Sequence, residues 1–244
     1  MADKENKTFK EKLSFFWKYN KVHVFIWAIG LIFLGIFLFQ QISSPVLLFH
    51  SMFLNTDNKE DNITEDLSAD FLKTYNVDPT SGIVIMEDSF SYYPGNDKKS
   101  EENFDSSEYI LVEKDKASLD IIVGPLSAVK DIAYNNMFQD LESILTDEEL
   151  SLCREHYLYV DQEVINELSA AYEADKDVSS IEIPDCKNPD EMNNAIPVMI
   201  DVSHCTKLAS LYNLDEQSEP IVLAIMTDAP DKELTLKFIQ YLMK

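Results

Sequence analysis

Residues 119–145 read LDIIVGPLSAVKDIAYNNMFQDLESIL, and this stretch says most about the fold. Leu119 to Val123 is a continuous apolar run that contains one Asp, the pattern of a strand buried on both faces. Gly124-Pro125 then turns the chain, and Ser127 is a residue type that caps helices. Apolar residues recur beyond it at the spacing of one helical face. The stretch therefore predicts a buried strand followed directly by a helix, the repeating unit of α/β folds.

The rest of the chain after residue 60 continues this alternation of strands and helices. Further strands are expected at Gly82–Met86, Tyr157–Val160, Ile181–Ile183, Val198–Val202 and Ile221–Thr227. Helices are expected at Thr64–Tyr75, at Ser106–Ala117, at Gln162–Glu173 and beyond Asp228, which can cap the last of them. This order favours an α/β domain with a mixed or parallel sheet.

The region before this domain contains a long uncharged run. Val22 to Ile42 carries no Asp, Glu, Lys or Arg over 21 residues. A helix of that length spans ~30 Å, the thickness of the hydrocarbon core of a bilayer. A cleaved signal peptide usually has a shorter apolar core that ends at a small-residue cleavage site, and no such site follows here. We interpret the run as an uncleaved transmembrane anchor. Residues typical of a membrane interface precede it, namely Trp17, Lys18, Tyr19 and Lys21.

The charges on the two sides of this run predict its orientation. Residues 1–21 contain six lysines and three acidic residues, a net charge of +3. Residues 43–244 carry 14 basic and 41 acidic side chains, a net charge of −27. Basic residues beside a membrane segment stay in the cytoplasm, so the N-terminus is expected inside and the C-terminal domain outside. The predicted organisation is a cytoplasmic basic tail (1–21), a transmembrane helix (22–42), a juxtamembrane connector (43–62) and an extracytoplasmic α/β domain (63–244).

Charge and motifs exclude several function classes. A net charge of −27 outside the membrane argues against a nucleic acid partner, because phosphates would be repelled. The sequence contains no GxGxxG, no GxxxxGK[ST] and no GxSxG motif. His204 and Cys205 are neighbours rather than spaced ligands, and adjacent residues on an extended chain point apart. We therefore predict no catalytic residues, no metal and no cofactor, and the chain is not expected to be an enzyme.

The remaining histidines and cysteines are assigned structural positions. His23 and His50 fall in or beside the predicted anchor. Three cysteines are an odd number for a compartment in which disulfides can form. Cys186 and Cys205 could pair, which would leave Cys153 as a buried thiol.

Three residues are candidate contacts for a ligand. Asp120 and Asp201 lie in or at the end of apolar strands, where a charge needs a partner and where ligand crevices of α/β sheets are found. Tyr134 could stack on a ligand, although core packing explains it equally well. The alternative for both acidic residues is that each caps a nearby helix.

Several segments resemble known families. The opening FFWKYNKVHVFI (15–26) resembles the start of small single-pass membrane proteins of unknown function from gut Firmicutes. Residues 119–145, and in particular Met137 to Leu141, are similar to a strand–helix stretch of the extracellular solute-binding proteins of ABC transporters. IPVMIDVSHCTKL (196–208) and DAPDKELTLKFIQYL (228–242) are similar to a later strand and to the terminal helix of that family. The resemblance implies a reduced solute-binding-like domain held at the membrane.

Two functional hypotheses remain open. The first is a non-enzymatic binding protein anchored in the bilayer, with a small solute as its ligand. The second is a structural or assembly subunit of a membrane complex, whose domain offers a binding surface to another membrane protein. A cleft lined by Asp120, Tyr134 and Asp201 would favour the first, whereas a continuous exposed apolar patch would favour the second.

Overall fold

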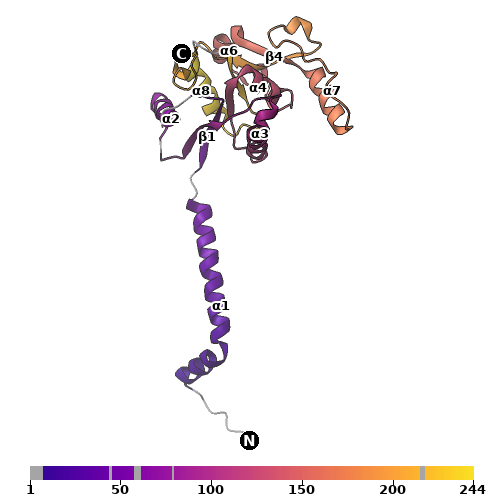
Figure 1. Ribbon diagram of the computed structural model, residues 1–244. Helices are drawn as coiled ribbons and strands as arrows, with labels where there is room; N and C mark the ends of the chain where they lie inside the picture. The colour runs from indigo at the N-terminus through magenta and orange to yellow at the C-terminus, as the bar shows by residue number, and fades with distance from the viewer. Residues whose placement is uncertain (1–7, 44–45, 58–61, 79, 215–217) are drawn as a thin grey trace. The chain divides into compact units, whose positions relative to one another are not determined.

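The computed structural model describes residues 8–43, 46–57, 62–78, 80–214 and 218–244. The chain forms two compact units, Met1–Pro45 and Val46–Lys244. The first contains helix α1 (Phe9–Ser43), which bends near its N-terminal end in Figure 1. Within the described residues, no helix is both long and apolar enough to cross a membrane.

The second unit is built on one six-stranded mixed sheet with the strand order β2-β1-β3-β6-β5-β4. In chain order the strands are β1 (Leu47–Leu54), β2 (Ile83–Phe90), β3 (Ile121–Pro125), β4 (Tyr157–Asp161), β5 (Ala195–Asp201) and β6 (Ile221–Ile225). β1 is parallel to both β2 and β3. β6 is antiparallel to β3 and to β5, and β4 is antiparallel to β5. The expected mixed sheet of an α/β domain is thus confirmed.

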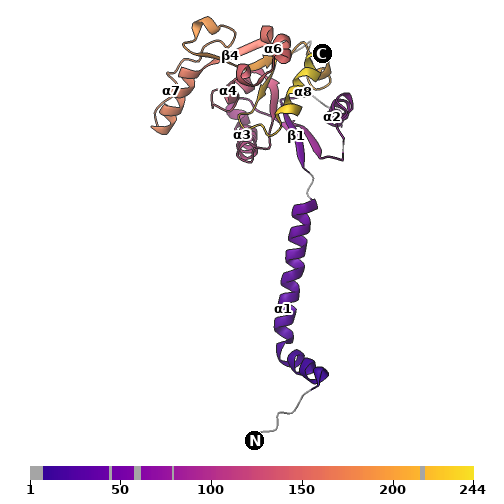
Figure 2. The same cartoon turned by 180° about the vertical axis from the view of Figure 1, so that it is seen from behind.

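Helices cover both faces of this sheet and enclose two separate hydrophobic clusters. Side chains alternate between the faces of a strand, so Ile121 and Val123 of β3 pack in one cluster and Ile122 in the other. The first face carries α2 (Ile63–Thr74), α5 (Leu141–Ile144), α6 (Asp147–Cys153) and α8 (Lys232–Met243). The second face carries α3 (Ser100–Asp115), α4 (Leu126–Ala133) and α7 (Gln162–Glu173). Figures 1 and 2 show α2 and α8 toward one end of the domain and α7 at the other.

The elements with the strongest apolar patterns agree with the sequence predictions. All five residues of β3 and all five of β6 are buried. α7 begins and ends at the predicted residues. The stripe of α8 that faces the core contains Leu234, Phe238, Tyr241 and Leu242, all of them buried. The first residue of α8 is preceded by Asp231, whose carboxylate caps the helix in place of the predicted Asp228.

The prediction of a juxtamembrane connector over residues 43–62 was wrong for residues 47–54. Residues 47–54 form β1, which lies between β2 and β3 inside the sheet. Phe49, Met52 and Phe53 are fully buried there. The sequence interpretation failed because this apolar run follows an even longer one and contains the polar residues His50 and Ser51. The compact domain therefore begins at Val46 rather than at residue 63.

Two smaller predictions also need correction. Ile181–Ile183 is not part of any strand. Cys186 and Cys205 do not pair, because all three cysteines are free and buried. The two thiols lie in different hydrophobic clusters, on opposite faces of the sheet. A disulfide between them would need Cα atoms about 4.4–6.8 Å apart, which this arrangement does not allow.

Candidate functional site

The structure separates the three residues that were expected to line one cleft. Asp120 immediately precedes Ile121, which pairs with Ile225 at the end of β6. Asp201 pairs with Val222 near the start of the same strand. The two acidic residues therefore lie toward opposite ends of the sheet, and they do not share a site.

Asp120 is fully buried and acts as a structural link to α8. One carboxylate oxygen accepts the N–H of Asp231, the N-cap residue of that helix, at 3.1 Å and the hydroxyl of Thr235, in its first turn, at 3.2 Å. The other oxygen accepts the N–H of His50 at 2.9 Å. Burial raises the pKa of Asp120 to about 6, although these hydrogen bonds oppose the shift. The capping alternative considered from the sequence therefore describes this residue.

Tyr134 belongs to the core rather than to a ligand cleft. It follows the last residue of α4, is 4% exposed and packs in the cluster on the second face of the sheet. Its hydroxyl lies 3.5 Å from the main-chain nitrogen of Asp161. Asp161 pairs with Ala195 at the start of β5, whereas Asp201 ends that strand, so Tyr134 and Asp201 are also apart.

Asp201 lines a hollow. The hollow has a volume of about 380 Å³ and lies where β5 ends and β6 begins, lined by Asp201, Ser203, Leu214, Ser218, Glu219, Pro220 and Ile221. Asp201 accepts the Ser203 N–H at 3.0 Å, which fixes the turn after β5. Ser203 Oγ in turn accepts the N–H of Ile221 at 2.9 Å. Two carboxylates and two serine hydroxyls thus give the hollow a polar, acidic wall.

Glu219 also connects this hollow to α4. Its carboxylate accepts the Ser127 main-chain N–H at 2.7 Å and the Ser127 hydroxyl at 2.9 Å. Carboxylates are favoured at helix N-termini, where main-chain N–H groups lack partners. One side of the hollow is therefore held in place by a link between residues that are 92 positions apart in the chain.

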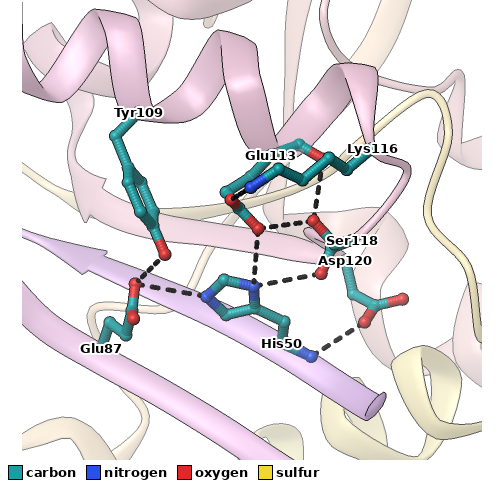
Figure 3. Close-up of polar contacts among 7 residues, drawn as sticks. All are labelled: His50, Glu87, Tyr109, Glu113, Lys116, Ser118 and Asp120. Carbon is teal, nitrogen blue, oxygen red and sulfur yellow. Dashed lines mark hydrogen bonds and ion pairs between the residues drawn. The ribbon is translucent and has the colours of Figure 1, made fainter. Parts of the chain in front are cut away.

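A second polar cluster, which sequence reasoning missed, surrounds His50 (Figure 3). His50 is 1% exposed and lies on β1. Its Nδ1 is 3.0 Å from the carbonyl oxygen of Ser118, and its Nε2 is 3.3 Å from a carboxylate oxygen of Glu87. The sequence analysis assigned this residue to a position in or beside the predicted anchor, whereas the structure buries it on a strand of the compact domain.

The carboxylates around His50 are themselves held in place. Tyr109 donates its hydroxyl to Glu87 at 2.7 Å. Glu113 lies 4.0 Å from His50 Nδ1 and accepts hydrogen bonds from Ser118 Oγ at 2.5 Å and from Lys116 at 2.7 Å. Burial opposes ionisation of Glu113, but these two donors lower its pKa below the usual value.

This cluster joins β1, β2 and α3, and its geometry favours a structural role. It contains no nucleophile next to the imidazole, and both ring nitrogens already have partners. Within the described residues, no group of three or more His, Cys, Asp or Glu side chains is placed to hold a metal ion. The partners of His50 lie 37 to 68 residues away in the chain, so no local sequence signal could have identified them.

The predicted interface residues lie on α1. Trp17 is 59% exposed, and together with Lys21, Val22, Phe25 and Ile26 it lines a shallow hollow on that helix. The side chains of Lys18 and Tyr19 lie outside the described residues.

Comparison of the chain with protein-family models, with curated proteins and with solved structures finds no match in any of the three.

Proposed function

We propose that this chain is a membrane-anchored extracytoplasmic binding protein without enzymatic activity, and that its ligand is a small solute. The observation that carries the proposal is the acidic hollow beside Asp201 and Glu219. A hollow of about 380 Å³ falls within the usual size of small-molecule sites. Its paired carboxylates and hydroxyls suit a ligand rich in hydrogen-bond donors, such as an amine, a sugar or a hydrated cation.

Membrane attachment is supported by the uncharged run Val22–Ile42 and by the basic residues that precede it. Large apolar side chains on α1 are also exposed, with Phe25 at 68%, Trp27 at 73% and Phe33 at 69%. Exposed apolar surface of this extent favours contact with a membrane or with another protein. The excess of positive charge before the run favours an inside N-terminus.

The resemblance to solute-binding proteins enters this proposal in a reduced form. Those proteins hold ligands between two lobes, whereas residues 46–244 form one compact unit on one sheet. The ligand would therefore lie at the edge of a single lobe, next to the end of β5.

Two experiments test the proposal. Protease treatment of intact cells should degrade the C-terminal domain and spare a tag placed at the N-terminus, and the reverse pattern would refute the orientation. A thermal-shift screen of the full-length chain in detergent should cover sugars, amino acids, amines, peptides and Ca²⁺. A ligand at 100 times its Kd adds about 2.7 kcal/mol, which raises the midpoint by several degrees.

Variants connect any shift to the hollow. Asp201→Asn should remove the shift, whereas Glu167→Gln on the exposed side of α7 should keep it. A shift that survives in Asp201→Asn places the ligand elsewhere. No shift with any class, together with co-purification of a membrane partner, would refute solute binding.

A second candidate function is favoured by the outer face of α3. Phe104, Leu111 and Val112 are exposed by 66%, 47% and 41%. Leu111 and Val112 follow Phe104 by seven and eight positions, so the three side chains share one helical stripe. This stripe favours the assembly hypothesis, in which the domain binds another membrane protein. Phe104→Ser should then abolish co-purification of that protein without changing the thermal midpoint by more than a degree or two.

A further inference from the structure

A group of sulfur and imidazole side chains lies where the chain after β5 meets the end of α8. The Sγ atom of Cys205 is 3.9 Å from Nε2 of His204 and 3.8 Å from Sδ of Met243. The ring of His156 stacks on that of His204, with centroids 4.2 Å apart and planes inclined by 21°. Three segments that are distant in the sequence therefore bring two sulfur donors and two imidazoles together.

The separations of Cys205 Sγ from the other two donor atoms match those of ligands around one metal ion. Metal–nitrogen bonds of about 2.0 Å and metal–sulfur bonds of about 2.3 Å are usual for first-row ions in proteins. At an angle of 120° they place nitrogen and sulfur about 3.7 Å apart and two sulfurs about 4.0 Å apart. The observed 3.9 Å from Cys205 Sγ to His204 Nε2 and 3.8 Å to Met243 Sδ are close to these values.

The chemistry of the donors selects the ion. A thiolate and a thioether are soft ligands, which prefer Cu(I), and imidazole suits copper as well. Ca²⁺ and Mg²⁺ require oxygen ligands, and the three donors contain none. We propose that Cys205, Met243 and His204 form a three-coordinate Cu(I) site, and that His156 positions the ring of His204 by stacking on it.

Burial of the donors leaves a route for the ion. Cys205 is 2% exposed, Met243 is half-buried and His204 is exposed. The ion would therefore reach the thiol from the solvent side, past the imidazole. None of the three donors lines the acidic hollow near Asp201, so this site does not depend on the proposed solute function.

Binding is a ligand exchange with a definite proton balance. The thiolate is the form of cysteine that binds a metal ion. When Cu(I) binds, the S–H bond breaks, a Cu–S bond forms and one proton passes to solvent. Copper remains Cu(I), and no oxidant or reductant takes part in the step.

The test uses the full-length chain in detergent, under anaerobic conditions, titrated with Cu(I) in competition with a colorimetric Cu(I) chelator. The natural chain should retain one Cu(I), and Cys205→Ser should retain none. Met243→Leu and His204→Gln change side chains that are not fully buried, and each should weaken binding at least ten-fold. The matched control is Cys186→Ser, a buried thiol on the opposite face of the sheet, which should bind as the natural chain does.

Two outcomes would overturn the proposal directly. The first is that the natural chain retains no more copper than Cys205→Ser does. The second is that Cys186→Ser loses as much copper binding as Cys205→Ser does. A third outcome concerns Cys153, which lies in the same hydrophobic cluster as Cys205. If Cys153→Ser loses binding while Met243→Leu still binds, the second sulfur ligand is the thiolate of Cys153 and not the thioether of Met243. That outcome would refute the assigned set of ligands. X-ray absorption should report two sulfurs and one nitrogen around copper, and about one proton should be released per ion at pH 7.

Discussion

The carboxylate of Asp120 lies 2.9 Å from the main-chain nitrogen of His50, so a buried acid joins the middle of β1 to the start of the adjacent parallel strand β3. The same side chain accepts the N–H of Asp231 at 3.1 Å, which ties the sheet to the N-terminus of α8. Asp120 therefore connects its own strand to two partners, His50 and Asp231, which lie 70 and 111 positions away in the chain.

Replacing this carboxylate by an amide should destabilise the domain. All the partners of the Asp120 side chain are donors, namely two N–H groups and the Thr235 hydroxyl. In Asp120→Asn one acceptor oxygen becomes an NH₂ group that faces a donor. We expect the free energy of unfolding to fall by about 1–3 kcal/mol, measured by urea denaturation at pH 7. The exposed Glu167→Gln should change it by less than about 0.5 kcal/mol, and equal effects in both variants would refute the role of Asp120.

The pH dependence of stability should separate Asp120 from Asp161. The pKa of Asp120 is raised to about 6 by burial, so the folded state holds this proton at pH values where the unfolded state has lost it. Its contribution is full below about pH 4 and is lost as the pH rises through about 6. Burial also opposes ionisation of Asp161, but N–H groups of Asn193, Glu163 and Asn194 lower its pKa overall. Its contribution is present above about pH 4 and is lost as the pH falls.

Denaturation curves between pH 3 and 8 measure both effects as differences from the natural chain. The stability of the natural chain relative to Asp120→Asn should decrease between pH 4 and pH 6. Its stability relative to Asp161→Asn should instead decrease below pH 4. Parallel curves for the natural chain and both variants would show that neither carboxyl has a shifted pKa.

The sequence predicts those parts of this fold that depend on local patterns. β3 and β6 are short uninterrupted apolar runs, and α7 and α8 have one apolar face, so period and composition suffice to find them. β1 was not predicted, since its buried polar residues His50 and Ser51 interrupt the apolar pattern. Their burial depends on neighbours in β2 and α3 that only the folded chain supplies.

The candidate sites depended still more on long-range contacts. The need of Asp120 for a partner was evident from its apolar surroundings, but the partner, the first turn of α8, lies more than 100 residues away. No local pattern indicates that Met243 lies beside Cys205 either, because the two are 38 positions apart. Spacing rules detect ligands within a loop or a helix, and they cannot detect donors that tertiary packing brings together.

The thiols should be inert in the folded, metal-free chain. Cys153, Cys186 and Cys205 are free and buried, and burial raises the pKa of Cys153 to about 12. The thiolate is the reactive form, so an aromatic disulfide reagent at pH 8 should modify none of the three within minutes. All three should react in urea. Reaction of one or more thiols at the rate seen in urea would contradict their burial.

Gly124 should tolerate no side chain, because β1 lies too close. A Cβ atom at this position would lie 2.9 Å from the Cβ of Leu54 and 3.5 Å from Val129. Gly124→Ala should therefore cost about 1–3 kcal/mol of unfolding free energy through overpacking. In the double variant with Leu54→Gly the Cβ atom that causes the steric conflict is absent, so its cost should be smaller than the sum of the two single costs. Additive costs would rule out the contact as the cause.

Tyr212 and Tyr157 are both buried, and they differ in whether the hydroxyl has a hydrogen-bond partner. The hydroxyl of Tyr212 lies 3.1 Å from the carbonyl oxygens of both Leu54 and Val123, so it links the end of β1 to the middle of β3. The hydroxyl of Tyr157 is also buried, but it has no hydrogen-bond partner in the described part of the chain. Removal of a hydrogen bond at a buried site costs about 1–2 kcal/mol, whereas removal of an unpaired hydroxyl relieves a desolvation penalty. We therefore expect Tyr212→Phe to lower the free energy of unfolding by about 1–2 kcal/mol and Tyr157→Phe to leave it unchanged or raise it.

Burial raises the pKa of Tyr212 well above its ordinary value, so its hydroxyl stays protonated and the cost of Tyr212→Phe should be the same at pH 6 and pH 9. Urea denaturation of the two variants at both pH values measures this difference, and equal losses in the two would show that hydroxyl burial, not the link between β1 and β3, determines the effect.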